Sequence, residues 1–166
     1  MKPLRVDVIL AFLFFTALLN ACGGGSGNAK SKAAPITPNS ADETTNSPNT
    51  NVEELGLLVR VPYDAEDIVW KDYASHKKLI AVLRFSTADC ERIVADAQNY
   101  RKPESVSIQS ESWFPDELVA QGDISGDDTL KGISYGANAF LQDPFNEGSI
   151  IRVEGTNYFV LQATAK

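Results

Sequence analysis

The chain has 166 residues, which suits one domain with extensions, and its 43% hydrophobic and 22% charged residues are typical of globular proteins. Its net charge of −7 comes without a cluster of basic residues. Such a surface repels the phosphates of nucleic acids and anionic lipids, so we exclude DNA or RNA as a partner.

The first 21 residues have the three-part anatomy of a secretory signal peptide. Two positive charges, on Lys2 and Arg5, precede an apolar run of 12 residues from Val8 to Leu19. A membrane-spanning helix needs ~20 apolar residues, so this run is too short for a permanent anchor. We therefore predict that residues 1–21 are a signal peptide.

The end of this run carries the sequence Leu19-Asn20-Ala21-Cys22. It resembles the lipobox of bacterial lipoproteins, Leu-(Ala/Ser)-(Gly/Ala)-Cys, from which it departs at Asn20. The resemblance implies cleavage before Cys22 and a lipid on its thiol, and two or three acyl chains anchor a protein stably to a membrane. Because Gly23 and not Asp follows, the resemblance favours the outer membrane, facing the periplasm, in a Gram-negative source. A plain secreted protein cleaved nearer Gly23 is the alternative.

Residues 22–51 are predicted to form the lipidated N-terminus and a flexible linker. After a Gly-Gly-Gly-Ser-Gly start, the segment is rich in Ala, Pro, Thr, Asn and Ser, and Ile36 is its only large apolar residue. It cannot bury enough apolar surface to fold, and as a coil it reaches about 30 Å. The pattern becomes globular at Val52, so we predict a single domain over residues 52–166.

The first half of this domain alternates between predicted strands and helices. Apolar runs at 55–61 and 79–85 indicate strands, the second of them central. Between them, the apolar spacing and early acidic residues of 64–73 favour a short helix. Ser86 offers an N-cap for a helix over 88–100, whose apolar residues share one face.

The second half contains a further helix and a hairpin. Val106 and Ile108 alternate with serines, which indicates a half-exposed strand, and Pro115 marks the start of a helix. The remaining predicted segments are a polar turn over 122–128 and a hairpin whose strands, 149–153 and 158–162, are joined by 154–157. The predicted class is α+β, an open mixed or antiparallel sheet of about 4–5 strands with 2–3 helices.

A possible nucleophile lies in the stretch from Gly132 to Gly136, which matches the Gly-x-Ser-x-Gly elbow of serine hydrolases around Ser134. The elbow needs an apolar strand before it and a histidine after it. Polar residues precede this stretch, and the only histidine, His76, lies upstream. We therefore favour a loop or turn here, with an envelope hydrolase using Ser134 as the alternative.

Cys90 has no intramolecular partner if Cys22 carries lipid, so no disulfide is predicted. Its position near a helix N-terminus could activate the thiol. It also shares a helix face with Ile93 and Val94, where cysteine acts as a small buried hydrophobe. We expect a core residue, with a reactive or intermolecular thiol as the alternative.

The segment Asp123–Asp128 carries oxygen ligands at loop-like spacing, but its glycine and its missing final glutamate do not fit an EF-hand. A solvated turn is the preferred interpretation and a weak calcium site the alternative. One histidine and one spare cysteine leave no metal-binding spacing, and we predict no metal and no cofactor.

Most of the aromatic side chains of the domain are expected in its core. The aromatic residues that this prediction concerns are Trp70, Trp113, Phe114, Tyr135, Phe140, Phe145, Tyr158 and Phe159. Trp113 and Phe114, between two elements, are the predicted exception and the candidate partner-binding residues, because interface aromatics concentrate binding energy.

The leading functional hypothesis is a non-enzymatic, lipid-anchored domain that binds another envelope component, such as a protein. The alternatives are the hydrolase described above and an inhibitor or immunity-type lipoprotein, for which the acidic charge would suit a basic partner.

Overall fold

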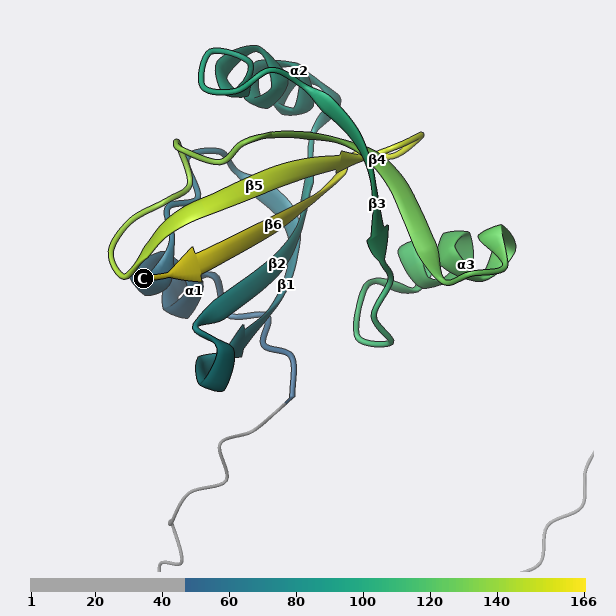
Figure 1. Cartoon of the computed structure of the whole chain (residues 1–166), viewed down its shortest axis with the longest axis horizontal. Coiled ribbons are helices and arrows are strands. Elements are labelled where there is room, and N and C mark those ends of the chain that lie inside the picture. The colour runs from purple at the N-terminus through teal and green to yellow at the C-terminus, as the bar shows by residue number, and fades with distance from the viewer. Residues whose placement is uncertain (1–46) are drawn as a thin grey trace, which may run out of the picture. The chain divides into compact units, whose positions relative to one another are not determined.

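The computed structural model describes residues 47–166, so the predicted signal peptide, Cys22 and most of the predicted linker lie outside the described residues. The described part contains three α-helices, one 3₁₀ turn and six strands (Figure 1). In chain order they are α1 (Val52–Leu58), β1 (Ala65–Tyr73), η1 (Ala74–His76), β2 (Lys78–Phe85), α2 (Thr87–Ala97), β3 (Glu104–Gln109), α3 (Asp116–Ser125), β4 (Thr129–Gly136), β5 (Phe145–Val153) and β6 (Tyr158–Ala165).

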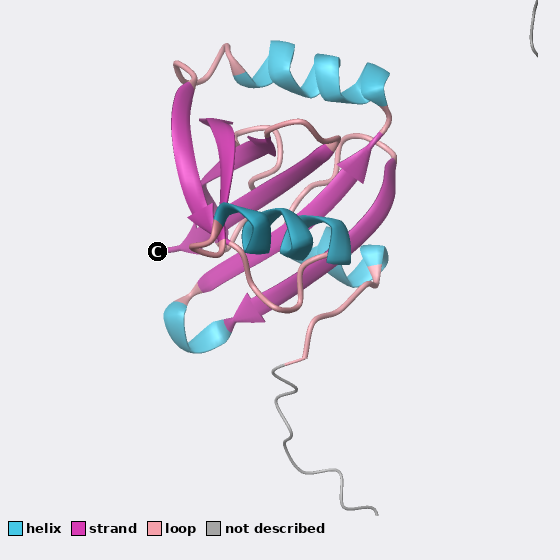
Figure 2. Cartoon of the chain, turned by 90° about the vertical axis from the view of Figure 1, so that its right-hand side faces the viewer, coloured by secondary structure: helices cyan, strands magenta, loops and turns pink. Residues whose placement is uncertain are grey.

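The six strands form one open sheet (Figure 2). Their order is β1-β2-β6-β5-β4-β3, and every neighbouring pair is antiparallel. The α+β class is confirmed, with one strand more than the 4–5 predicted. None of the helices in residues 47–166 combines the length and the apolar character needed to cross a membrane.

Both faces of the sheet are covered, which explains why β2 and β6 are almost continuously apolar. Successive side chains of a strand point to opposite faces. Leu79 and Leu83 of β2 therefore join a core that α1 and α2 cover, whereas Ile80 and Val82 join a second core beneath α3. Cys90 on α2 belongs to the first of these cores.

The strand predicted over 55–61 is wrong, because the chain forms helix α1 there. The side-chain oxygen of Asn51 accepts the backbone N–H groups of Glu53 and Glu54, at 2.9 and 3.2 Å, and so caps the helix. Leu55 is fully buried against the sheet. The apolar run from Leu55 favours a strand when taken alone, but the capping residue Asn51 before it starts a helix.

The helix predicted over 64–73 is also wrong, because these residues form the edge strand β1. The strand pairs with β2 from end to end, with one irregularity near its start. Its buried residues Ile68 and Trp70 alternate with more exposed ones, a period of two that the acidic residues of the segment obscure.

The other predicted elements are confirmed in type. β2, β3, the hairpin of β5 and β6, and α2 with Ser86 as its N-cap lie where the sequence predicts them. α3 begins directly after Pro115 but continues to Ser125, so only the last part of the predicted 122–128 turn is a turn. Asn49, predicted to be linker, pairs with Trp70 of β1 through two backbone hydrogen bonds of 2.8 Å.

Candidate functional site

Ser134 lies in the middle of strand β4, so the predicted loop or turn over Gly132 to Gly136 is wrong. Its side chain is 5% exposed. The Arg101 guanidinium donates one hydrogen bond to the Ser134 hydroxyl, at 2.7 Å, and another to the Tyr135 carbonyl, at 3.0 Å. A straight buried strand does not present the hydroxyl at a sharp strand-to-helix turn, as the elbow requires.

His76 lies too far from Ser134 to act as its base. In the sheet register Ser134 lies opposite Ile151, which lies opposite Val160, which lies opposite Val82. Lys78, where β2 begins, is three strands across and four residues along from Ser134, which is on the order of 20 Å, and His76 precedes it in η1. These two residues therefore do not form a catalytic pair.

Cys90 is fully buried at the start of α2, which confirms the core interpretation. Its Sγ lies 3.8 Å from the Phe85 carbonyl and 3.7 Å from the Asn157 carbonyl. Burial raises the pKa of the thiol, and this outweighs the opposing effect of the Arg152 charge. The pKa shift is opposite to that of an activated cysteine.

The turn that links α3 to β4 is held together by its own side chains. The Asp127 carboxylate accepts hydrogen bonds from the hydroxyls of Ser125 and Thr129, at 2.7 and 2.6 Å. These bonds lower the pKa of Asp127, Thr129 contributing more than Ser125. No three His, Cys, Asp or Glu side chains converge as metal ligands within residues 47–166.

Of the two predicted partner-binding residues, Phe114 is a core residue, 5% exposed and packed beneath α3. Trp113 is half-buried, and its indole N–H donates to the Glu111 carboxylate at 2.6 Å and to the Tyr73 hydroxyl at 3.3 Å. Its ring meets Phe114 edge-on, with centroids 4.7 Å apart. Both residues line a small hollow of 480 Å³. Trp113 thus presents only part of its ring to a partner.

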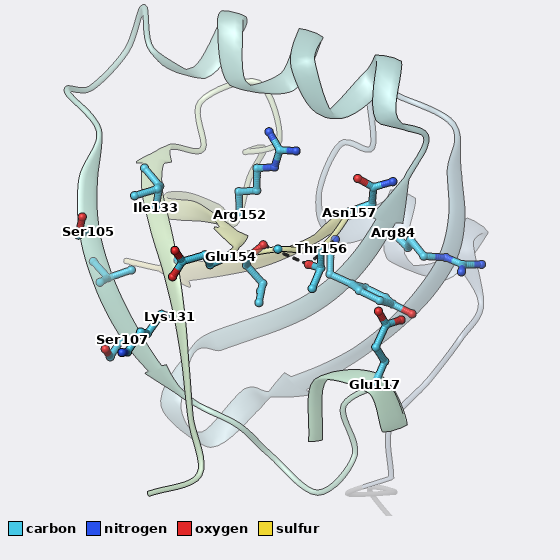
Figure 3. Close-up of a pocket in the computed structure, with 15 residues that line it drawn as sticks. Arg84, Ser105, Ser107, Glu117, Lys131, Ile133, Arg152, Glu154, Thr156 and Asn157 are labelled. Atoms are coloured by element: carbon cyan, nitrogen blue, oxygen red, sulfur yellow. Dashed lines mark hydrogen bonds between the residues drawn. The ribbon is translucent and has the colours of Figure 1, made fainter. Parts of the chain in front are cut away.

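A larger hollow of 860 Å³ lies where β3 and β4 face the β5–β6 hairpin (Figure 3). Polar side chains dominate its walls. The lining residues are Arg84, Ser105, Val106, Ser107, Glu117, Lys131, Gly132, Ile133, Arg152, Val153, Glu154, Gly155, Thr156, Asn157 and Tyr158.

The floor of this hollow is built from two rows of residues that run across three strands. In the first row Ser107 of β3 pairs with Lys131 of β4, and the Lys131 carbonyl accepts the N–H of Glu154 at 2.9 Å. In antiparallel strands, residues directly opposite each other point to the same face. The three side chains are therefore neighbours on one face, although they are far apart in the sequence.

The second row lies two residues along the same strands. Ser105 pairs with Ile133, which pairs with Arg152. The next row on this face, Tyr135 and Ile150, is buried in the core that α1 and α2 cover. The two rows are thus the part of this face that the helices leave open, and Ile133 of β4 lies among their polar groups (Figure 3). The hollow also reaches the opposite face, where Arg84, Val153 and Tyr158 lie on the side that α3 covers.

Three of the eleven Lys and Arg side chains in residues 47–166 line this hollow. Neither Lys131 nor Arg152 forms an ion pair with another described residue. The third, Arg84, lies 3.7 Å from Glu66 and 5.9 Å from the Tyr158 ring. Lys131 and Arg152 lie beside serine hydroxyls, with Glu154 as the one carboxylate that lines the hollow on their side of the sheet. Two such cations can hold anionic and hydrogen-bonding groups of a ligand.

This site cannot be predicted from the sequence, because its residues come from strands β2, β3 and β4, helix α3 and the β5–β6 hairpin. The usable signal is the alternation in 129–136, where Lys131, Ile133 and Tyr135 share one face. Comparisons of the chain with protein-family models, curated proteins and solved structures found no match.

Proposed function

We propose that this protein is a lipoprotein of the bacterial cell envelope whose folded domain binds another envelope component without catalysing a reaction on it. The signal-like leader and the lipobox resemblance around Cys22 support the membrane anchor. In a Gram-negative source the anchor lies in the outer membrane and the domain faces the periplasm.

The observation that carries the binding function is the 860 Å³ hollow with the charges of Lys131 and Arg152, which form no ion pair within residues 47–166. A charge that is held on a sheet face without a counter-charge is a ready contact for a ligand. Phe114 is buried and Trp113 donates its N–H within the domain. The hollow is therefore a better candidate for the binding surface than the aromatic pair.

The anchor is tested by growing cells with an alkyne-tagged fatty acid. We expect the wild-type protein to carry the tag and to sediment with membranes, and Cys22→Ser to lose both properties. An untagged, soluble wild-type protein that begins at a residue other than Cys22 would refute the anchor.

The binding surface is tested by site-specific photocrosslinking in intact cells. A photoreactive residue at Ile133 is expected to give a discrete adduct that Arg152→Gln weakens. The same residue at Asp143, an exposed position outside the hollow, serves as the matched control, and one at Trp113 tests the aromatic surface. The hollow is refuted as the binding surface if Ile133 gives no adduct or the same adducts as Asp143.

A further inference from the structure

We propose that the component bound at this hollow is an extended acidic polypeptide segment, which joins the sheet as a seventh strand beside β3 and directs alternate carboxylates towards Lys131 and Arg152. The inference rests on the proposed binding function and specifies its partner. It is carried by two features, the open edge of the sheet and the charges beside it.

The first feature is the hydrogen-bonding pattern of β3, the last strand of the sheet. The Ser110 N–H donates to the Asp128 carbonyl, at 2.7 Å, in the register of the β3–β4 ladder. In an antiparallel pair, bonded and non-bonded residues alternate. Ser105, Ser107 and Gln109 therefore direct their backbone N–H and C=O groups away from β4.

No backbone group of residues 47–166 outside the sheet bonds to this edge of β3. The opposite edge of the sheet differs, because Asn49 occupies both backbone groups of Trp70 in the middle of β1. An edge strand with free groups is a template for another strand. Within the described chain β3 offers the longer uninterrupted template.

The second feature is the set of polar and charged side chains that would lie beside a strand added to β3. Ser105 and Ser107 point their side chains into the hollow, so residues placed opposite them would face the hollow too. Lys131 lies opposite Ser107 and extends towards it (Figure 3). An added strand lies about 10 Å from β4, which a Glu and a Lys side chain span together. Arg152 lies one strand further, beside Ile133.

The charge of the domain as a whole does not oppose an acidic ligand at this place. Surface charges are screened beyond about 8 Å at physiological ionic strength, so the groups that line the hollow decide the interaction. Of the charged residues that line the hollow, Arg84 and Glu117 lie on the side of the sheet that α3 covers. The side with Ser105 and Ser107 has two cations, Lys131 and Arg152, and one carboxylate, that of Glu154. Carboxylates on every second residue of an added strand would supply ion-pair partners for these cations.

The test uses full-length protein in a nonionic detergent and a ten-residue peptide that alternates Glu with Val. Two matched peptides replace every Glu by Gln, or N-methylate alternate backbone amides so that no strand can be added. We expect the Glu peptide to bind at least tenfold more tightly than either control. We also expect it to slow amide hydrogen exchange of Ser105 and Ser107.

Protein variants separate the two features. Ser107→Pro removes an outward N–H that the β3–β4 ladder does not use, and Lys131→Gln removes a charge. Each is expected to weaken binding at least tenfold, whereas Lys78→Gln, at the start of β2, leaves it unchanged. Circular dichroism and the thermal midpoint show whether Ser107→Pro is folded, and the N-methylated peptide tests strand addition without any change to the protein.

Several results would overturn the inference. The first is that the Glu peptide does not bind, and the second is that its N-methylated form binds equally well, which would mean an oxyanion site without strand addition. The third is that the peptide slows hydrogen exchange on β1 and not on β3. The fourth is that a second copy of the chain already protects β3 when no peptide is present. If the peptide fails while Ile133 crosslinks a polysaccharide or another partner in cells, the proposed function stands and only this inference fails.

Discussion

Gly132 in the floor of the hollow allows β4 and β5 to approach closely, and its replacement by alanine should loosen them. A Cβ on Gly132 would lie 2.5 Å from the Arg152 carbonyl oxygen and 2.9 Å from a methyl group of Ile151. Ordinary contact begins near 3.4 Å, so the strands must separate by nearly 1 Å. Forcing one methyl group into a packed site costs about 1–3 kcal/mol. We expect Gly132→Ala to lower the free energy of unfolding by that amount.

The matched control is the same substitution at Gly56 in helix α1, where nothing lies within 4 Å of the added Cβ. Alanine in a helix interior is about 0.5–1 kcal/mol more favourable than glycine, so Gly56→Ala should stabilise the domain. Urea denaturation of the two variants and the wild type, with a common slope, gives the three free energies. Equal stability of Gly132→Ala and the wild type would refute the close approach of β4 and β5.

Three further predictions follow from local contacts. Removing the N-cap of α2 with Ser86→Ala should cost about 1 kcal/mol in urea denaturation, and a loss below a few tenths would contradict the cap. The Cys90 thiol should resist a maleimide in the folded protein and react once urea unfolds it, since it is buried and its pKa is raised; rapid native labelling would contradict this. The pKa values of Tyr63 and Tyr73 are raised to about 12, in Tyr63 chiefly by its hydrogen bond to a carboxylate and in Tyr73 chiefly by burial. The stability that these two raised pKa values contribute to the fold is fully present below pH 10 and is lost as the pH rises towards 12. The free energy of unfolding should therefore fall between pH 10 and pH 12, and it should fall less steeply in a variant with both tyrosines replaced by phenylalanine.

The sequence predicts the elements whose local signals agree with their packing. α2 has a capping serine and an apolar face, and the β5–β6 hairpin has a polar Gly-containing turn between apolar strands. At β1 and α1 the signals conflict. The acidic residues around Ile68 look like a helix start, and the apolar residues from Leu55 onward look like a strand. Tertiary contacts decide both, since β1 pairs with β2 along its whole length and Leu55 is buried by the core.

The sequence does not indicate strand β4, because two of its eight residues are glycines and three others, Thr129, Ser134 and Tyr135, carry hydroxyl groups. Gly132 suggests a loop in the sequence, but in the structure it lies inside strand β4. It is required because the β5 backbone approaches too closely for any side chain. A glycine that serves a close approach and a glycine that serves a turn look the same in one sequence.

The hollow is hidden from the sequence for a different reason. Ser107, Lys131 and Glu154 are more than twenty residues apart from one another, and only the register of β3, β4 and β5 makes them neighbours. A slip of one residue between β3 and β4 would turn Ser105 and Ser107 to the opposite face and place Val106 beside Lys131. The charge and hydroxyl pattern of the site is therefore a property of strand pairing. The same register fixes which backbone groups of β3 point outwards, so the two features that we assign to one partner have a single structural origin.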